Sequence, residues 1–353
     1  MRTLTRREAL LTLAGGCSTM LLGNVAAETK RHRLGIVIYA FGIHERANWS
    51  GRHPGLVPAL ALLEECHLLG AGGIQCPFGP KDAPHVDELR RRAEQYGMYV
   101  EAIVNPPRDR TDVARFENDV RLAQATGASV ARTVIMPGRR YEQFKTLAEF
   151  HEFEARGLQS LQLAEPVLAR HRFRLAVENH KDQRIAEKLD TLRRVGSEWI
   201  GLCVDVANNF ALMEDPLETA RAFAPFAFTV HLKDLAAEAY PDGWLLADMA
   251  LGEGFLDLKA IVDVLRKAKP EVKLNLETIT RDALKLPVRT EAFWATLPGD
   301  RRALLARMSA VVNAKPRAQP LSAVAKLPRA QQLALERRNV ERSLAYAREN
   351  LGF

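Results

Sequence analysis

The segment FTVHLKD, residues 228–234, decides the reading of this chain because apolar and polar side chains alternate along it. Alternation predicts a strand with one apolar face and one face that carries His231 and Lys233. Three more runs combine an apolar face with polar groups near the C-terminal end: RLAVENH (174–180), GLCVDVAN (201–208) and VKLNLET (272–278).

Four earlier runs also have strand character: LGIVIYAFG (34–42), GGIQCPF (72–78), MYVEAIV (98–104) and SVARTVIM (129–136). Helical patterns separate most of these runs, and such alternation indicates a parallel sheet. Eight strands in about 245 residues predict an α/β fold of the (β/α)8 TIM-barrel type. An open doubly wound sheet is the alternative. It usually has fewer strands, and no glycine-rich phosphate loop opens the first helix here.

The chain divides into three predicted parts. Residues 1–27 resemble an export signal, residues 28–280 would form the barrel, and residues 281–353 would form an extension packed on it. Prolines are frequent between residues 281 and 330, which predicts an irregular path. The final stretch, from residue 329, has the pattern of a helix.

The first 27 residues have the features of a twin-arginine export signal. Arg6 and Arg7 precede a short apolar stretch, and Ala26 and Ala27 end a small-residue cleavage pattern. A buried or membrane-spanning helix is the alternative, but glycines interrupt the apolar run. The sequence AGGC ending at Cys17 lacks the leucine of a lipidation site, so we do not expect a lipoprotein. We expect a periplasmic protein with no membrane contact after signal removal.

Composition excludes few functions. The chain has 353 residues, 47% hydrophobic and 26% charged, with a formal net charge of +7. A basic surplus is compatible with an acidic substrate or nucleic acid, but it is more often a solvated face. Outside the signal, three cysteines without a CxxC pattern indicate neither a disulfide framework nor a zinc knuckle.

Four strand ends carry residues of the types that bind metals. In the predicted barrel, the polar faces point inward, and active sites form at the C-terminal ends of the strands. Glu178, Asp205, His231 and Glu277 therefore converge from four strands. Three carboxylates and an imidazole would repel one another without a cation. Mostly oxygen ligands favour one divalent ion such as Mn²⁺, Mg²⁺, Co²⁺ or Zn²⁺.

The motifs LAVENHKD, LCVDVANNF, TVHLKD, LGEGFLDLKAIVDVL and LNLETITRD resemble the xylose isomerase-like TIM-barrel superfamily, the sugar phosphate isomerase/epimerase family. The resemblance covers roughly residues 34–350. It implies that Glu178, Asp205, His231 and Glu277 are metal ligands. It also implies that Glu178 and Glu277 are catalytic and move a substrate proton, as in the epimerases of that family.

Other polar residues near the strand ends are weaker candidates. Asn208 and Asp234 are expected to orient metal ligands. Five side chains are candidates for substrate contact, each with a structural alternative: His180, Lys233, Arg281, Glu101 and Trp294.

The expected function is a metal-dependent isomerase or epimerase that removes a proton next to a sugar carbonyl and forms an enediolate. A lyase or hydrolase of 3-keto-glycosides would share this first step. An endonuclease IV-like nuclease and a non-catalytic sugar-binding barrel are the remaining alternatives. We expect a small carbohydrate as partner, no nucleic acid, and possible assembly into a homo-oligomer.

Overall fold

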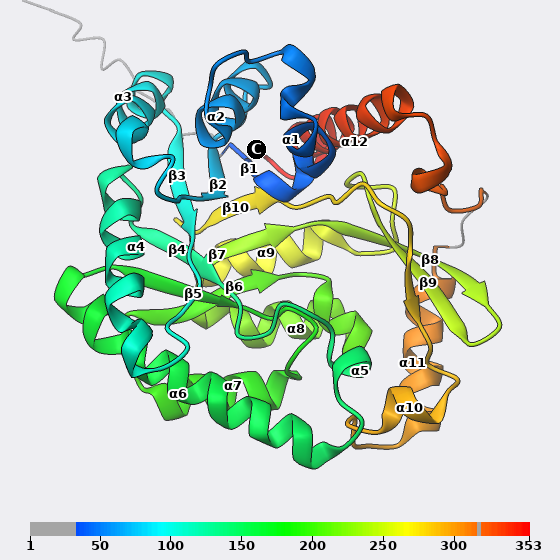
Figure 1. Ribbon diagram of the computed structural model, residues 1–353. Coiled ribbons are helices and arrows are strands. Elements are labelled where there is room, and N and C mark those ends of the chain that lie inside the picture. The colour runs from blue at the N-terminus through cyan, green and yellow to red at the C-terminus, as the bar shows by residue number, and fades with distance from the viewer. Residues whose placement is uncertain (1–32, 316–318) are drawn as a thin grey trace, which may run out of the picture. The chain divides into compact units, whose positions relative to one another are not determined.

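Eight parallel strands close into a barrel in the order β1-β10-β7-β6-β5-β4-β3-β2, as expected for a TIM barrel (Figure 1). The computed structural model describes residues 33–315 and 319–353. The predicted export signal, residues 1–27, lies outside the described residues. All eight runs predicted as strands overlap a barrel strand.

The barrel strands are β1 (Gly35–Val37), β2 (Gly73–Pro77), β3 (Tyr99–Ile103), β4 (Val130–Thr133), β5 (Arg174–Glu178), β6 (Ile200–Asp205), β7 (Ala227–Leu232) and β10 (Lys273–Leu276). The larger helices between them are α2 (Pro58–Leu68), α3 (Val86–Tyr96), α4 (Val113–Ala125), α6 (Leu147–His171), α7 (Ile185–Val195), α8 (Pro216–Phe223) and α9 (Leu258–Ala268). Two short helices, α1 (Gly42–Arg46) and α5 (Arg140–Gln143), follow β1 and β4.

The apolar strand faces pack outward against the helices, which leaves the polar faces inside the barrel. Val204, Val230 and Leu274 are fully or almost fully buried in one core with Ile261 and Leu265 of α9. Removing this apolar surface from water is the main force that holds helices on a barrel. The inward direction of the polar groups follows, because successive side chains of a strand alternate.

Phe228 is the exception to the predicted alternation. The register between β6 and β7 shifts at Leu202 and Cys203, which pair with Ala227 and Thr229 and leave Phe228 unpaired. Such an irregularity turns the extra side chain away from its expected direction. Phe228 packs against a small cluster that contains Ala176 and Cys203, instead of against the outer helices.

A three-stranded antiparallel sheet follows β7, and the sequence analysis did not anticipate it. Strands β8 (Asp234–Tyr240) and β9 (Gly243–Met249) form a hairpin, and β11 (Leu284–Leu286) pairs with β9. In Figure 1 the hairpin projects from the barrel beside the extension. The hairpin is therefore an insertion between the seventh strand and α9.

The extension is more regular than its prolines suggested. It contains α10 (Glu291–Trp294), α11 (Arg301–Asn313) and α12 (Arg329–Asn350). Glu336 of α12 accepts hydrogen bonds from the backbone N–H groups of Ile43 and His44, at 2.7 and 2.9 Å. The last helix is thereby fixed beside the start of the barrel. None of the helices in the described residues is both long and apolar enough to cross a membrane.

Candidate metal centre

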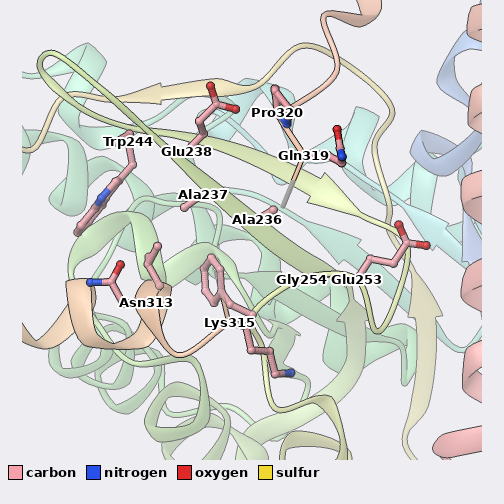
Figure 2. Close-up of a pocket in the computed structure, with 13 residues that line it drawn as sticks. Ala236, Ala237, Glu238, Trp244, Glu253, Gly254, Asn313, Lys315, Gln319 and Pro320 are labelled. Atoms are coloured by element: carbon pink, nitrogen blue, oxygen red, sulfur yellow. The ribbon is translucent and has the colours of Figure 1, made fainter. Parts of the chain in front are cut away.

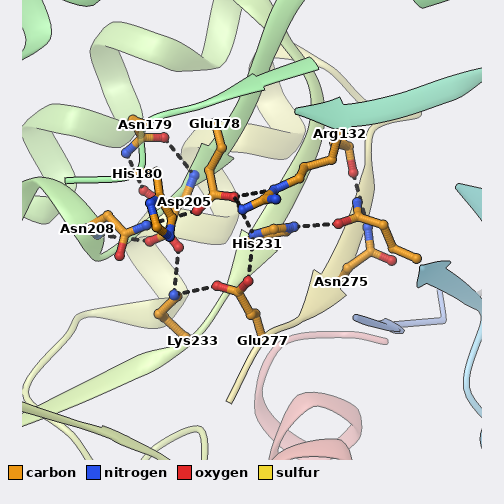
Figure 3. Close-up of polar contacts among 12 residues, drawn as sticks. Arg132, Glu178, Asn179, His180, Asp205, Asn208, His231, Lys233, Asn275 and Glu277 are labelled. Atoms are coloured by element: carbon orange, nitrogen blue, oxygen red, sulfur yellow. Dashed lines mark hydrogen bonds and ion pairs between the residues drawn. The ribbon is translucent and has the colours of Figure 1, made fainter. Parts of the chain in front are cut away.

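Glu178, Asp205, His231 and Glu277 meet inside the C-terminal mouth of the barrel (Figure 3). Each offers one ligand atom, and the four atoms lie within 4.8 Å of one another. The exposed fractions are 0% for the first three and 3% for Glu277. Buried carboxylates at such distances require compensating positive charge. The four predicted ligand positions are therefore close enough to share one cation.

His231 presents an unpartnered ring nitrogen to this cluster. Its Nε2 lies 2.7 Å from the side-chain oxygen of Gln75, while the amide nitrogen of Gln75 donates to Glu101 at 2.9 Å. This arrangement places a proton on Nε2 and turns Nδ1 toward the carboxylates. Nδ1 is buried, has no hydrogen-bond partner among the residues that the structure describes, and lies 3.3 Å from an oxygen of Glu277. A ring nitrogen oriented in this way is typical of a metal-binding histidine.

Two basic side chains compensate the carboxylates. Arg132 of β4 donates to Glu178, with Nε at 2.5 Å. Lys233 Nζ lies 2.7 Å from Asp205 Oδ2 and 2.5 Å from Glu277 Oε2. Burial alone would raise the pKa of Glu277, but His231 and Lys233 hold that pKa well below its usual range. Glu277 is therefore ionised and able to accept a proton.

The turn after β6 fixes the carboxylate of Asp205. Its Oδ1 accepts the backbone N–H groups of Ala207 and Asn208, at 2.9 and 2.8 Å. Asn179 accepts the backbone N–H of Asp205 and donates to its carbonyl, both at 2.8 Å. The second carboxylate oxygen, Oδ2, has an ion pair but no hydrogen bond. One oxygen thus orients the side chain, and the other faces the cluster.

Cys203 also lies within ligand distance of Glu178 and His231. Burial raises the pKa of its thiol well above the usual value. A metal ligand must be the thiolate, so the four-residue set is the better donor set. Cys66, Cys76 and Cys203 are all buried free thiols, as the sequence indicated.

A pocket of about 530 Å³ opens above the cluster, and we call it the mouth pocket. Lys233 and Glu277 line it together with Arg132, so it reaches the candidate metal centre directly. The other residues that line it are Tyr39, Pro77, Ile103, Asn105, Val134, Pro137, Gly138, Arg139, Glu142, His180, Lys181, Ile279 and Arg281.

Three of the weaker candidates lie where substrate contact was expected. His180, Lys233 and Arg281 line the mouth pocket. Nδ1 of His180 lies 3.2 Å from the Met136 carbonyl, and burial lowers the pKa of this histidine to about 3. The imidazole is therefore neutral. Asn208 donates to Glu178 at 3.0 Å, which fits the predicted orienting role.

Three other candidates are placed differently from the expectation. Glu101 lies deeper in the barrel, where it binds Gln75, Thr229 and Asn275 instead of lining the mouth pocket. Trp294 donates to the Val288 carbonyl at 2.8 Å, packs within the extension and does not line the mouth pocket. Asp234 accepts four backbone N–H groups around the hairpin, and among the described residues no hydrogen bond or ion pair joins it to the four ligands.

Sequence reasoning missed several side chains that complete the centre: Gln75, Arg132, Asn179 and Lys181. Each belongs to a strand or strand end that the sequence analysis had identified. A polar residue inside an apolar strand, such as Gln75 in GGIQCPF, is the signal that could have revealed them, because a buried polar group needs a partner.

A second cavity of about 430 Å³ lies apart from these ligands (Figure 2). The hairpin contributes Ala236, Glu238 and Trp244 to its wall, and the extension contributes Asn313 and Lys315. None of the four candidate ligands lines it. The cavity that reaches the buried carboxylates is the mouth pocket.

Residues 63–296 match the family model described as xylose isomerase-like TIM barrel. The chain belongs to this family. It is also 26% identical over 252 residues to a 3-oxo-isoapionate decarboxylase of Pectobacterium atrosepticum, a match that covers 69% of this chain and 84% of that protein. This relative of the chain is an enzyme. Structural neighbours of the chain, such as an L-ribulose 3-epimerase, are enzymes too.

Solved structures have the same fold. An L-ribulose 3-epimerase matches with a TM-score of 0.55 and 17% identity, over 90% of this chain and 99% of that chain. The IolI protein, solved with a bound zinc atom, matches with a TM-score of 0.51 and 14% identity, over 80% of this chain and 98% of that chain. At such identities these matches support the xylose isomerase-like barrel alone.

Proposed function

We propose that this protein is a divalent-metal-dependent enzyme that forms an enediolate from a carbohydrate with a carbonyl group. The observation that carries the proposal is the buried set of three carboxylates and one unpartnered imidazole nitrogen beneath the mouth pocket. Glu178, Asp205, His231 and Glu277 would hold the ion. When bound, a divalent ion supplies Lewis-acid stabilisation of the negative charge that develops on the carbonyl oxygen.

The acid–base step belongs to the two glutamates. Glu277 is ionised and lines the mouth pocket, so it can take a proton from the carbon next to a substrate carbonyl. Glu178 lies on β5, across the cluster, and hydrogen bonds from Arg132 and Asn208 fix its carboxylate. Return of a proton from this second side would invert the carbon, which is the outcome of epimerisation.

Decarboxylation is the second candidate, and it uses the same stabilised charge. A 3-oxo acid would lose its carboxylate as CO₂, and the electrons of the broken C–C bond would form an enolate, which is an enediolate where the adjacent carbon carries a hydroxyl. A proton from water, relayed by a glutamate, would then be added to that carbon. Two observations favour it: the decarboxylase named above is a relative, and five basic residues line the mouth pocket. Isomerase or epimerase chemistry remains the leading proposal because the cluster contains two glutamates, one to remove the proton and one to return it.

Elemental analysis of the purified protein, followed by incubation with oxo-sugars and oxo-sugar acids in D₂O, tests the proposal. We expect about one divalent ion per chain and metal-dependent deuterium incorporation next to the carbonyl. Release of CO₂ with deuterium incorporation would select decarboxylation. Both candidates would be contradicted if the purified protein contains no metal and, after Mn²⁺, Mg²⁺, Co²⁺ or Zn²⁺ is added, neither exchanges a substrate proton nor releases CO₂.

A further inference from the structure

Lys181 and Arg281 line the same mouth pocket, and their charges are poorly compensated. Lys181 donates to the amide oxygen of Asn208 and has no ion pair among the residues that the structure describes. Arg281 has one acidic neighbour, Asp248, whose carboxylate lies 3.5 Å away, at the limit of a hydrogen bond. Among the described residues, Arg281 therefore has one weakly bound carboxylate as its ion-pair partner, and Lys181 has none.

The other basic residues of the mouth pocket are well paired. Arg139 binds both carboxylate oxygens of Glu142, at 2.5 and 2.6 Å. Arg132 binds Glu178, and Lys233 bridges two of the candidate metal ligands. Lys181 and Arg281 thus differ from the other cations of the mouth pocket, which are already bound to carboxylates.

The backbone of Lys181 is also unusual. Its φ of 59° lies in the left-handed region, which a non-glycine residue adopts at an energetic cost. The carbonyl of Lys181 accepts the backbone N–H of Arg140 at 3.0 Å, so neighbouring chain holds this conformation. Burial and the nearby Lys233 lower the pKa of the Lys181 ammonium to about 8. An anion beside the ammonium would offset both the cost of burying its charge and the repulsion from Lys233.

We propose that Lys181 and Arg281 form an anion subsite that binds a carboxylate or phosphate group of the substrate. The orientation of that substrate, with its carbonyl over the metal centre, rests on the proposed function. The anion binding itself does not. Both cations line the same pocket as Glu277 and Lys233. The substrate class is therefore an oxo-sugar acid or an oxo-sugar phosphate instead of a neutral sugar.

Calorimetric titration with three probes tests this subsite: D-glucitol, which is neutral, D-gluconate, which carries a carboxylate, and D-glucitol 6-phosphate. Wild type is expected to bind at least one anionic probe about tenfold more tightly than glucitol, because charge-assisted hydrogen bonds form. The preference should persist in protein treated with a chelator, since the subsite consists of side chains alone. Whichever anionic probe binds more tightly identifies the group.

Lys181→Gln and Arg281→Gln should each remove most of this preference, and Arg281→Gln should keep its metal affinity within about twofold of wild type. Arg139→Gln is the matched control, because Glu142 already neutralises Arg139, and it should keep the preference. Equal binding of all three probes to wild type would overturn the subsite. A preference unchanged in both Lys181→Gln and Arg281→Gln would also overturn it. If the wild-type protein binds no divalent metal ion, that result would instead contradict the proposed function.

Discussion

At the scale of residues, Gln75 determines which nitrogen of His231 faces the candidate metal centre. Its amide can donate to Glu101 only while its oxygen accepts from His231 Nε2. Glu101 is held in turn by Thr229 and Asn275, at 2.7 and 2.9 Å. The tautomer of the imidazole therefore depends on a chain of buried hydrogen bonds from four strands.

Replacing Gln75 with leucine should weaken metal binding by roughly 10–100-fold, which is typical when a hydrogen-bond partner of a ligand is lost. The ring of His231 would lose the acceptor that fixes its tautomer. Competition with a metal-binding dye measures the affinity. Thr133→Val is the control, because Thr133 is a buried barrel residue whose hydroxyl has no hydrogen-bond partner in the described part of the chain. An unchanged affinity in Gln75→Leu would contradict this role.

Glu277→Gln should lower turnover by roughly 10²–10⁴-fold, because the variant lacks the ionised oxygen that accepts the proton. Deuterium incorporation into an oxo-sugar substrate at saturating metal measures the loss. Glu142→Gln changes another carboxylate of the mouth pocket, one that binds Arg139 instead of the cluster. It should retain turnover within about tenfold. Equal losses in the two variants would argue against Glu277 as the base.

At the scale of elements, the β8–β9 hairpin depends on one carboxylate at its base. Asp234 accepts backbone N–H groups of Leu235, Gly252, Gly254 and Leu256, at 2.9 to 3.1 Å. It connects the start of β8 with the loop before α9. The hairpin also carries Asp248, the neighbour of Arg281 in the proposed anion subsite.

Asp234→Ala should reduce the free energy of unfolding by about 3 kcal/mol, since buried N–H groups would lose a charged acceptor. Asp257→Ala is the matched control: Asp257 caps α9 through a single 3.0 Å hydrogen bond from Ala260. Loss of such a cap costs about 1 kcal/mol. Urea unfolding followed by circular dichroism compares them. Similar losses in both variants would mean that Asp234 acts as an ordinary cap.

At the scale of the whole barrel, the C-terminal helix α12 binds α1, the short helix that follows β1. Glu336 is 1% exposed and binds two backbone N–H groups and Nδ1 of His44. Arg140, itself fully buried, joins the extension to the barrel through the hydroxyl of Thr296 and the carboxylate of Glu187. The extension is thus part of the folded unit and not a loose tail.

Glu336→Ala should lower the free energy of unfolding by roughly 3 kcal/mol, because it leaves buried donors without an acceptor. Glu341→Ala, on the same helix, removes an exposed partner of Arg337 and should cost less than about 0.5 kcal/mol. Urea unfolding of both variants gives the comparison. A small effect of Glu336→Ala would mean that α12 contributes little to the stability of the barrel.

The sequence alone determined the barrel and the four converging side chains. Alternation with a period of two assigns each strand residue to a face, and parallel strands bring their C-terminal ends to one mouth. Glu178, Asp205, His231 and Glu277 could therefore be placed together without coordinates. The assignment of side chains to faces was wrong at Phe228, where an irregular register between β6 and β7 interrupts the alternation.

Only the tertiary structure decided which residues support that centre. Gln75 is separated from His231 by 156 positions, and Arg132 from Glu178 by 46, so no local pattern relates them. The structure also placed Glu101 beneath the centre and Trp294 away from it. The physical reason is that a face is a local property of a strand, whereas a buried hydrogen-bond partner depends on which distant segments the closed barrel brings into contact.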